Sequence, residues 1–214
     1  PKTREVQVVR DEARYRFVEV APSRRCARDP DRALITRSGG YPAVLVEPDG
    51  AGGSRYHMWY GGFSAATGVV IDTVSADGVT WDPPGWNPDH MGLFEEHSAY
   101  SDHYRPSVVA APAGGYWVYY FDQRHQFDDE WRVIARASGS DGVHWSDEIA
   151  VLEAGEPGAW DGHRVWAPWV IPVSGGWRLY YAGSDRANGR VAIGMATSED
   201  GLSWTRHPDN PILT

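Results

Sequence analysis

Side chains that could transfer protons or hold a polar substrate gather just ahead of two prolines, Pro106 and Pro168. The candidates for catalysis in these segments are Asp102, His103, Arg105, Asp161 and His163. A histidine exchanges protons near neutral pH, and an arginine binds a carboxylate or phosphate through two parallel hydrogen bonds. The candidates for substrate binding offer mainly flat aromatic faces, and they are Tyr41, Tyr104, Arg164, Trp166 and Trp169.

Asp122 is a further catalytic candidate, because it follows an aromatic run at residues 117–120. Glycine stands at the equivalent place in two other repeats of the chain, which leaves space beside this carboxylate. Several candidates also have a structural interpretation, which the sequence leaves open. These are Asp122 as a partner of Arg124, Arg105 as a partner of Asp102, His163 as a hydrogen-bonding partner of a neighbouring sheet, and Asp161 as a turn residue after Trp160.

The elements that must position these side chains come from an internal repeat of about 60 residues. Each copy contains, in the same order, a proline before an apolar run, an aromatic run that ends in tyrosine, and an Asp-Gly pair followed by tryptophan. The prolines are Pro42, Pro106 and Pro168, the tyrosines are Tyr60, Tyr120 and Tyr181, and the tryptophans are Trp81, Trp145 and Trp204. Because the three markers stay in step, each copy is expected to be one structural unit.

Each copy predicts four short β-strands joined by tight turns. The apolar runs are too short for helices and rich in β-branched residues, and proline is tolerated at the first residue of a strand. Glycine-rich segments after the first strand and Asp-Gly after the third are typical of turns. Radial stacking buries such sheets and protects their edges. The sequence therefore predicts an all-β, β-propeller-like fold with three complete four-stranded blades and a partial N-terminal one.

The repeat units are expected at about residues 37–90, 101–153 and 163–214, within a single domain that covers residues 1–214. Residues 1–36 are expected to form the partial unit, because residues 14–21 resemble a third strand and residues 28–35 are similar to residues 207–213. This number of units is small for a ring. The sequence leaves three alternatives: an unusually small ring, a ring completed by a homodimer, or a fragment.

Composition excludes several classes of partner. The net charge of −9 argues against a nucleic-acid partner and against docking on anionic lipid. No apolar run is long enough to span a membrane. Cys26 is the one cysteine and no leader is visible, which predicts a cytoplasmic protein, while the start at Pro1 leaves a removed leader open. The eight histidines lack a metal-ligand spacing and no phosphate-binding glycine loop is present, so no metal and no other cofactor is expected.

Two segments carry a resemblance to a known superfamily. Residues 198–204 read Ser-Glu-Asp-Gly-Leu-Ser-Trp, and Trp160-Asp161-Gly162 leads to Pro168 and then to Tyr180-Tyr181-Ala182-Gly183. With the pattern of proline, apolar strand and Tyr-Tyr strand, residues 28–214 resemble the five-bladed β-propeller glycoside hydrolases of families 43, 32 and 130. The resemblance implies an enzyme that acts on a sugar or a sugar-like small molecule in a central axial pocket.

The sequence departs from this superfamily where its catalytic acids are expected. The resemblance places those acids beside the proline that opens the innermost strand. The residues that flank the three prolines here are Gly40, Tyr41 and Ala43, then Tyr104, Arg105 and Ser107, then Trp166, Ala167 and Trp169. None of them is an acid. Two alternatives therefore stand beside a hydrolase: a non-hydrolytic enzyme of small-metabolite biosynthesis (a cyclase, lyase or isomerase), and a non-catalytic carbohydrate-binding propeller.

Overall fold

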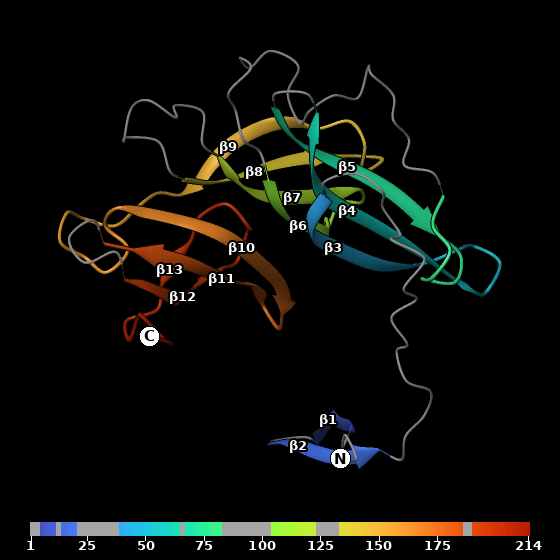
Figure 1. Cartoon of the computed structure of the whole chain (residues 1–214), viewed down its shortest axis with the longest axis horizontal. Helices are drawn as coiled ribbons and strands as arrows, with labels where there is room; N and C mark the ends of the chain where they lie inside the picture. Colours follow the sequence, from blue (N-terminus) through green and yellow to red (C-terminus); the bar gives the residue numbers. More distant parts are fainter. Residues whose placement is uncertain are drawn as a thin grey trace. The chain divides into compact units, whose positions relative to one another are not determined.

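Every regular element in the part of the chain that the structure describes is a β-strand, as the sequence predicts. The computed structural model describes residues 5–11, 14–20, 39–64, 67–82, 104–122, 133–185 and 190–214 (Figure 1). These residues contain no helix that could cross a membrane. The chain separates into two compact units, Pro1–Leu34 and Ile35–Thr214. The division lies close to the predicted end of the partial unit at residue 36.

The first unit contains one antiparallel hairpin. Its strands are β1 (Glu5–Asp11) and β2 (Arg14–Val20), and Val8 is the register partner of Phe17. The strand β2 covers most of the strand predicted at residues 14–21.

The described residues of the second unit form three antiparallel sheets, whose strands follow one another in chain order. Sheet I contains β3 (Gly39–Pro48), β4 (Ser54–Ser64) and β5 (Thr67–Ser75). Sheet II contains β6 (Tyr104–Ala110), β7 (Tyr116–Asp122), β8 (Val133–Gly139) and β9 (Ser146–Leu152). Sheet III contains β10 (Arg164–Val173), β11 (Gly176–Ser184), β12 (Val191–Ser198) and β13 (Thr205–Arg206).

Sheets II and III have the four strands that the repeat predicts. Sheet I has three strands among the described residues, and its predicted outer strand, which opens at Trp81, lies outside them from residue 83 onward. The chain does begin to pair beyond β5, because the Asp82 N–H donates to the Val74 carbonyl at 2.9 Å. The first strand of sheet II, β6, contacts the first strands of both other sheets, β3 and β10.

The first strand of each sheet bends at the residue before its proline. Tyr41, Arg105 and Ala167 have φ values of 57°, 62° and 51°, in the left-handed region that side chains other than glycine seldom adopt. At each place the register to the second strand shifts, as in a β-bulge. Proline has no N–H to lose from the ladder, so it tolerates the interruption. The repeated bend therefore separates the residues before each proline from the regularly paired part of the strand that follows it.

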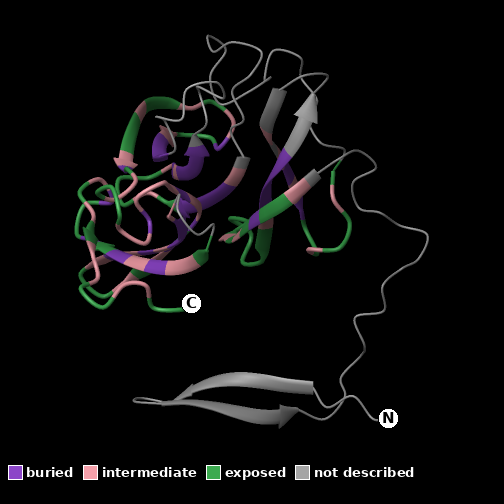
Figure 2. Ribbon diagram, turned by 60° about the vertical axis from the view of Figure 1, so that its left-hand side comes forward, coloured by how far each residue is buried: buried purple, intermediate pink, exposed green. Residues whose placement is uncertain are grey.

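The cores lie between the sheets, where buried residues from neighbouring repeats meet (Figure 2). Between sheets II and III, Tyr119 and Ile134 pack with Val165, Leu179 and Tyr181, all below 2% exposed. The core between sheets I and II contains Ala43, Trp59, Val108, Tyr116, Val118, Tyr120, Ala135 and Ala137. Each sheet therefore depends on a neighbour to bury an apolar face.

A hydrogen bond of one repeated type joins each sheet to the next. The Trp59 indole of sheet I donates to the Gly142 carbonyl of sheet II at 2.7 Å, and the Tyr119 hydroxyl of sheet II donates to the Gly201 carbonyl of sheet III at 2.8 Å. Trp59 and Tyr119 occupy the same register position, and both accepting glycines belong to the Asp-Gly turns. We call this contact, an aromatic donor on the second strand and a glycine carbonyl in the next sheet's turn, the latch.

The Asp-Gly turns are held by their aspartate side chains. Asp77 Oδ1 accepts the N–H groups of Val79 at 2.8 Å and Thr80 at 2.6 Å, and Asp141 and Asp200 bind the corresponding backbone groups of their own turns. Hydrogen bonds to a carboxylate favour its charged form. The Thr80 and Val79 N–H groups accordingly lower the pKa of Asp77 to about 2, from an ordinary value of 3.8.

These turns are expected to make the protein sensitive to acid. Since the folded pKa of Asp77 lies below the unfolded one, its contribution to stability is complete above about pH 4 and is lost as the pH falls toward 2. In Asp77→Asn the amide oxygen can accept the same N–H groups without titrating. Urea unfolding between pH 5 and 2.5 should show a smaller loss of stability for this variant than for the wild type. Asp209→Asn, an exposed position outside these turns, is the control, and equal losses for all three proteins would contradict the prediction.

Candidate functional site

The residues ahead of Pro42 and Pro106 meet across two sheets. The Arg105 guanidinium lies over the Tyr41 ring, 4.7 Å from its centroid, and its Nη2 donates to the Tyr41 hydroxyl at 3.3 Å. Both residues occupy the left-handed bend described above. The bend turns them out of the regular ladder, and the contact of β3 with β6 brings them together.

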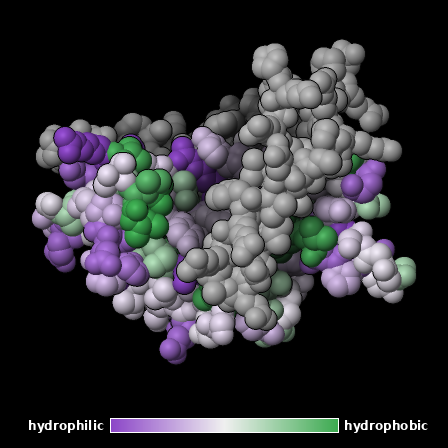
Figure 3. Space-filling model, turned by 90° about the horizontal axis from the view of Figure 1, so that it is seen from below, coloured by the Kyte–Doolittle hydropathy of each residue, from purple (hydrophilic) through white to green (hydrophobic). Residues whose placement is uncertain are grey.

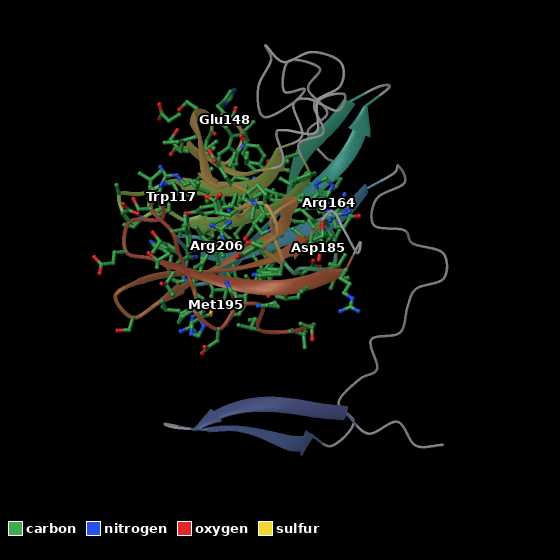
Figure 4. The ribbon with its side chains drawn as sticks, turned by 90° about the vertical axis from the view of Figure 1, so that its left-hand side faces the viewer. Trp117, Glu148, Arg164, Asp185, Met195 and Arg206 are labelled. Carbon is green, nitrogen blue, oxygen red and sulfur yellow. The ribbon has the colours of Figure 1, made fainter. Side chains whose placement is uncertain are left out.

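Sheet III contributes a second stacked pair, which lies two and four residues ahead of its proline rather than directly before it. The Arg164 guanidinium lies 4.6 Å from the centroid of the Trp166 ring, and both residues precede Pro168 on β10. Arg164 is the register partner of Ser184, which places it beside Asp185 (Figure 4). Stacking on an aromatic face holds a guanidinium in one orientation and leaves its edge for hydrogen bonds.

The sheets carrying these pairs are joined by a buried hydrogen bond behind the prolines. The Val170 N–H of β10 donates to Ser107 Oγ of β6 at 2.9 Å. Arg105 lies two residues before Ser107, and Trp166 lies four residues before Val170. The two stacked pairs therefore begin neighbouring first strands, and we call them together the proline-side group.

The side chain of Asp161 makes its hydrogen bonds with residues outside the proline-side group. Its side chain is 2% exposed, and its Oδ2 accepts hydrogen bonds from the Tyr181 hydroxyl at 3.0 Å and from Arg206 Nε at 2.9 Å. Burial raises the pKa of Tyr181, and the negative charge of Asp161 raises it further. Burial alone would lower the pKa of Arg206, but the hydrogen bond and charge of Asp161 outweigh it and raise that pKa. This geometry favours the structural interpretation of Asp161.

Other predicted site residues are placed in part or not at all. Asp102 and His103 lie outside the described residues. The backbones of Tyr104 and Asp122 end β6 and β7 at the same edge, because Tyr104 is the partner of Phe121, while their side chains are not among those described. The His163 N–H donates to the Ser184 carbonyl at 3.0 Å, beside the proline-side group.

Trp169 lies apart from the other aromatic candidates. It follows Pro168, is 52% exposed, and is the register partner of Tyr180 in the middle of sheet III. Its place in the repeat is that of Ala43 and Ser107, which are both 2% exposed because the next sheet covers them. Trp169 therefore stands on a sheet face rather than among the residues ahead of the prolines.

The structure also gathers a polar cluster that the sequence analysis did not select. His57 Nε2 lies 3.2 Å from Asp72 Oδ2, and the Tyr116 hydroxyl donates to Glu47 at 2.6 Å. Burial raises the pKa of Tyr116 to about 12, and the Glu47 hydrogen bond contributes. His57 is 3% exposed and stacks on Trp59 with centroids 3.7 Å apart, which leaves no room for a substrate. The cluster stabilises the junction of sheets I and II. The one sequence signal that could have pointed to it is the position of His57 inside the aromatic run of its repeat.

Two surface hollows lie at the hairpin ends of the strands, opposite the ends that carry the proline-side group. One is lined by the β6–β7 hairpin and the turn after β8, including Tyr116, Trp117 and Trp145. The other is lined by the β10–β11 hairpin and the turn after β12, including Trp177, Arg178 and Asp200. Within the described ranges, no group of three or more His, Cys, Asp or Glu side chains could hold a metal ion.

No family model matches the sequence, and no curated protein matches it. Solved structures do match. A family 117 glycoside hydrolase from the marine bacterium Zobellia galactanivorans superimposes over 83% of this chain and 57% of its own, with a TM-score of 0.66 and 19% identity. The chain has the fold of the propeller glycoside hydrolases.

Two further structures show how far this fold likeness extends. A β-1,2-mannobiose phosphorylase from Listeria innocua matches with a TM-score of 0.60 and 19% identity, over 79% of this chain and 44% of its own. The Bacillus subtilis arabinanase matches with a TM-score of 0.54 and 12% identity, over 77% of this chain and 53% of its own. The chain thus spans about half the length of these structures. The likeness confirms an all-β fold of the propeller type, whereas the number of blades stays a prediction.

Proposed function

We propose that this protein is an enzyme of carbohydrate metabolism that holds its substrate at the proline-side group. The observation that carries the proposal is the pair of stacked arginines, Arg105 on Tyr41 and Arg164 on Trp166, at the start of adjacent first strands. Sugars need flat apolar faces for their rings and hydrogen-bonding groups for their hydroxyls, and this group supplies both. The fold is shared with glycoside hydrolases and a disaccharide phosphorylase, which supports the same substrate class.

The second candidate is a non-hydrolytic reaction, or binding alone, at the same residues. Glycoside hydrolysis uses two carboxyl groups placed about 5–10 Å apart across the scissile bond. Here the positions that flank the prolines hold no acid, and Asp161 is engaged with Tyr181 and Arg206. Of the acids predicted from the sequence, this leaves Asp122 and Asp102 for catalysis. We therefore expect little hydrolysis of simple aryl glycosides.

The two candidates are separated by activity and binding measured on the same variants. Aryl arabinosides, xylosides, fructosides and mannosides test hydrolysis, and calorimetry with the matching free sugars tests binding. Trp166→Ala should weaken binding of any sugar that binds by at least about tenfold, because it removes the ring and the support of Arg164. Arg55→Ala is the control, since Arg55 forms an exposed ion pair with Glu47 at 3.1 Å on the hairpin side.

Either of two results would contradict the proposal. Binding that is unchanged in Trp166→Ala and Arg105→Ala would show that the substrate lies elsewhere. Rapid hydrolysis that disappears in Asp161→Asn, with stability retained, would make Asp161 a catalytic carboxylate and return the protein to ordinary hydrolases. Thermal unfolding of each variant distinguishes loss of the site from loss of the fold.

A further inference from the structure

The latch leaves one donor and one acceptor unused. Sheets I and II each place an aromatic donor on the turn of the following sheet, as Trp59 and Tyr119 do. Tyr180 occupies the same register position in sheet III, and its hydroxyl forms no hydrogen bond within the described part of the chain. The Gly78 carbonyl, in the turn of sheet I, receives no donor from the described residues. The unused donor and the unused acceptor therefore lie on the two outer sheets.

The first strand of each of these two faces carries an exposed side chain where its counterparts are buried. On the donor side, Trp169 is 52% exposed, whereas Ala43 and Ser107 at the same position are each 2% exposed. Tyr180 and Met195 lie on the same face, and Figure 4 shows Met195 on the side of β12 away from Trp117. The donor face of sheet III therefore carries apolar side chains in contact with solvent.

The acceptor side repeats this difference. Val44 of sheet I is 44% exposed, whereas Val108 and Val170 at the same position are 5% and 4% exposed. In Figure 3, apolar side chains reach the surface in separate patches. An exposed apolar sheet face next to an unsatisfied polar contact is typical of an association surface.

The charges on the two faces are also complementary. The side chain that each turn contacts in the preceding sheet is found by adding a Cβ atom to the turn glycine. A Cβ on Gly142 would meet His57 of sheet I, and a Cβ on Gly201 would meet Trp117 of sheet II. Arg178 holds the same place in sheet III, and its buried Nε has no hydrogen-bond partner in the described residues. The turn at Gly78 carries Asp77, whose lowered pKa keeps it ionised. A turn of this kind would bring a carboxylate to the unpaired guanidinium.

We propose that the donor face of sheet III binds the β3–β5 sheet of a second copy of this chain, head to tail. Tyr180 would donate to the partner's Gly78 carbonyl, Arg178 would face the partner's Asp77, and Trp169 would cover the partner's Val44. The contact repeats, between chains, the interface that joins sheets I and II and sheets II and III. Because it is heterologous, each copy has one donor face and one acceptor face to offer.

The test is the mass of the full chain in solution, measured by sedimentation velocity from about 1 to 100 µM. We expect two or more chains per particle at the upper concentrations. Trp169→Glu and Val44→Glu should each weaken association by about a hundredfold or more, because each places a charge in the apolar contact. Tyr180→Phe, which removes only the hydroxyl, should weaken it by about threefold to tenfold. Ile149→Glu, at an exposed position of β9 away from both faces, should leave the mass unchanged.

Mixing the two charged variants tests the head-to-tail arrangement itself. The Trp169→Glu chain keeps its acceptor face and the Val44→Glu chain keeps its donor face, so the mixture should form a complex of one chain of each. A wild-type chain that stays monomeric throughout would overturn the proposal, and would be the result if another part of the same polypeptide covers these faces. Association that survives Val44→Glu but not Trp169→Glu would also overturn it, because the partner surface would then not be sheet I.

Discussion

Asp161→Ala is expected to lower the free energy of unfolding by about 3 kcal/mol. The substitution leaves the Arg206 guanidinium and the Tyr181 hydroxyl without the carboxylate they share at 2.9 and 3.0 Å. Removing one partner of a buried ion pair costs about 3–5 kcal/mol, and the 36% exposure of the Arg206 side chain moves the expectation to the lower end. In a chain of this length, this corresponds to a fall in melting temperature of about 6–12 °C.

Two further variants separate structure from chemistry at this position. Asp161→Asn keeps an acceptor for Tyr181 but loses the charge that faces Arg206, so its stability should fall between those of the wild type and Asp161→Ala. Asp209→Ala removes an aspartate that is 88% exposed and should change stability by less than about 0.5 kcal/mol. Urea unfolding followed by tryptophan fluorescence measures all three. A stable Asp161→Ala protein that has lost activity would instead support a catalytic role.

Gly142→Ala is expected to lower the free energy of unfolding by about 3 kcal/mol, through the junction of sheets I and II. Gly142 has a φ of 80°, and a Cβ there would lie 2.8 Å from Trp59 and 2.9 Å from His57, both buried side chains. The left-handed backbone costs an alanine about 1 kcal/mol, and crowding a packed interface adds about 1–3 kcal/mol. The clash also displaces Trp59 from the Gly142 carbonyl, which accepts its indole N–H.

Gly50→Ala is a matched control for this prediction. Gly50 has a φ of 79°, almost the same as that of Gly142, but no atom lies within 4 Å of an added Cβ. Its replacement should therefore cost only the backbone part, about 1 kcal/mol. If the two variants are equally stable in urea unfolding, the latch contributes nothing measurable and the junction of the sheets depends on other contacts.

The strands could be predicted from the sequence because they depend on local patterns. Proline, β-branched runs, glycine-rich hairpins and Asp-Gly turns are read within a few residues of each other, and the repeat supplied each pattern three times. Sheets II and III contain the strands that the pattern predicts. The Asp-Gly turns also close as expected, because Asp77 and its counterparts bind backbone groups two and three residues away.

The candidate site could be predicted only in part. The sequence placed Tyr41, Arg105, Arg164 and Trp166 beside the prolines, and the structure describes them as stacked pairs. It gave no means of knowing that Tyr41 and Arg105, from different repeats, touch each other. Nor did it reveal the left-handed bend at these residues, since a bend of this kind is imposed by the packing of neighbouring strands.

Tertiary structure alone decided which acids and aromatics are engaged with the rest of the fold. Asp161 meets Tyr181 from β11 and Arg206 from β13, and such distant partners leave no local trace in the sequence. Trp169 has the same place in its repeat as the buried Ala43 and Ser107, yet it is exposed, because burial depends on whether a neighbouring sheet covers the face. The sequence by itself thus determined the repeat, its strands and its turns, which follow from short-range periodicity and turn chemistry. The contacts between repeats determined which of their side chains are buried and braced and which stay accessible for binding.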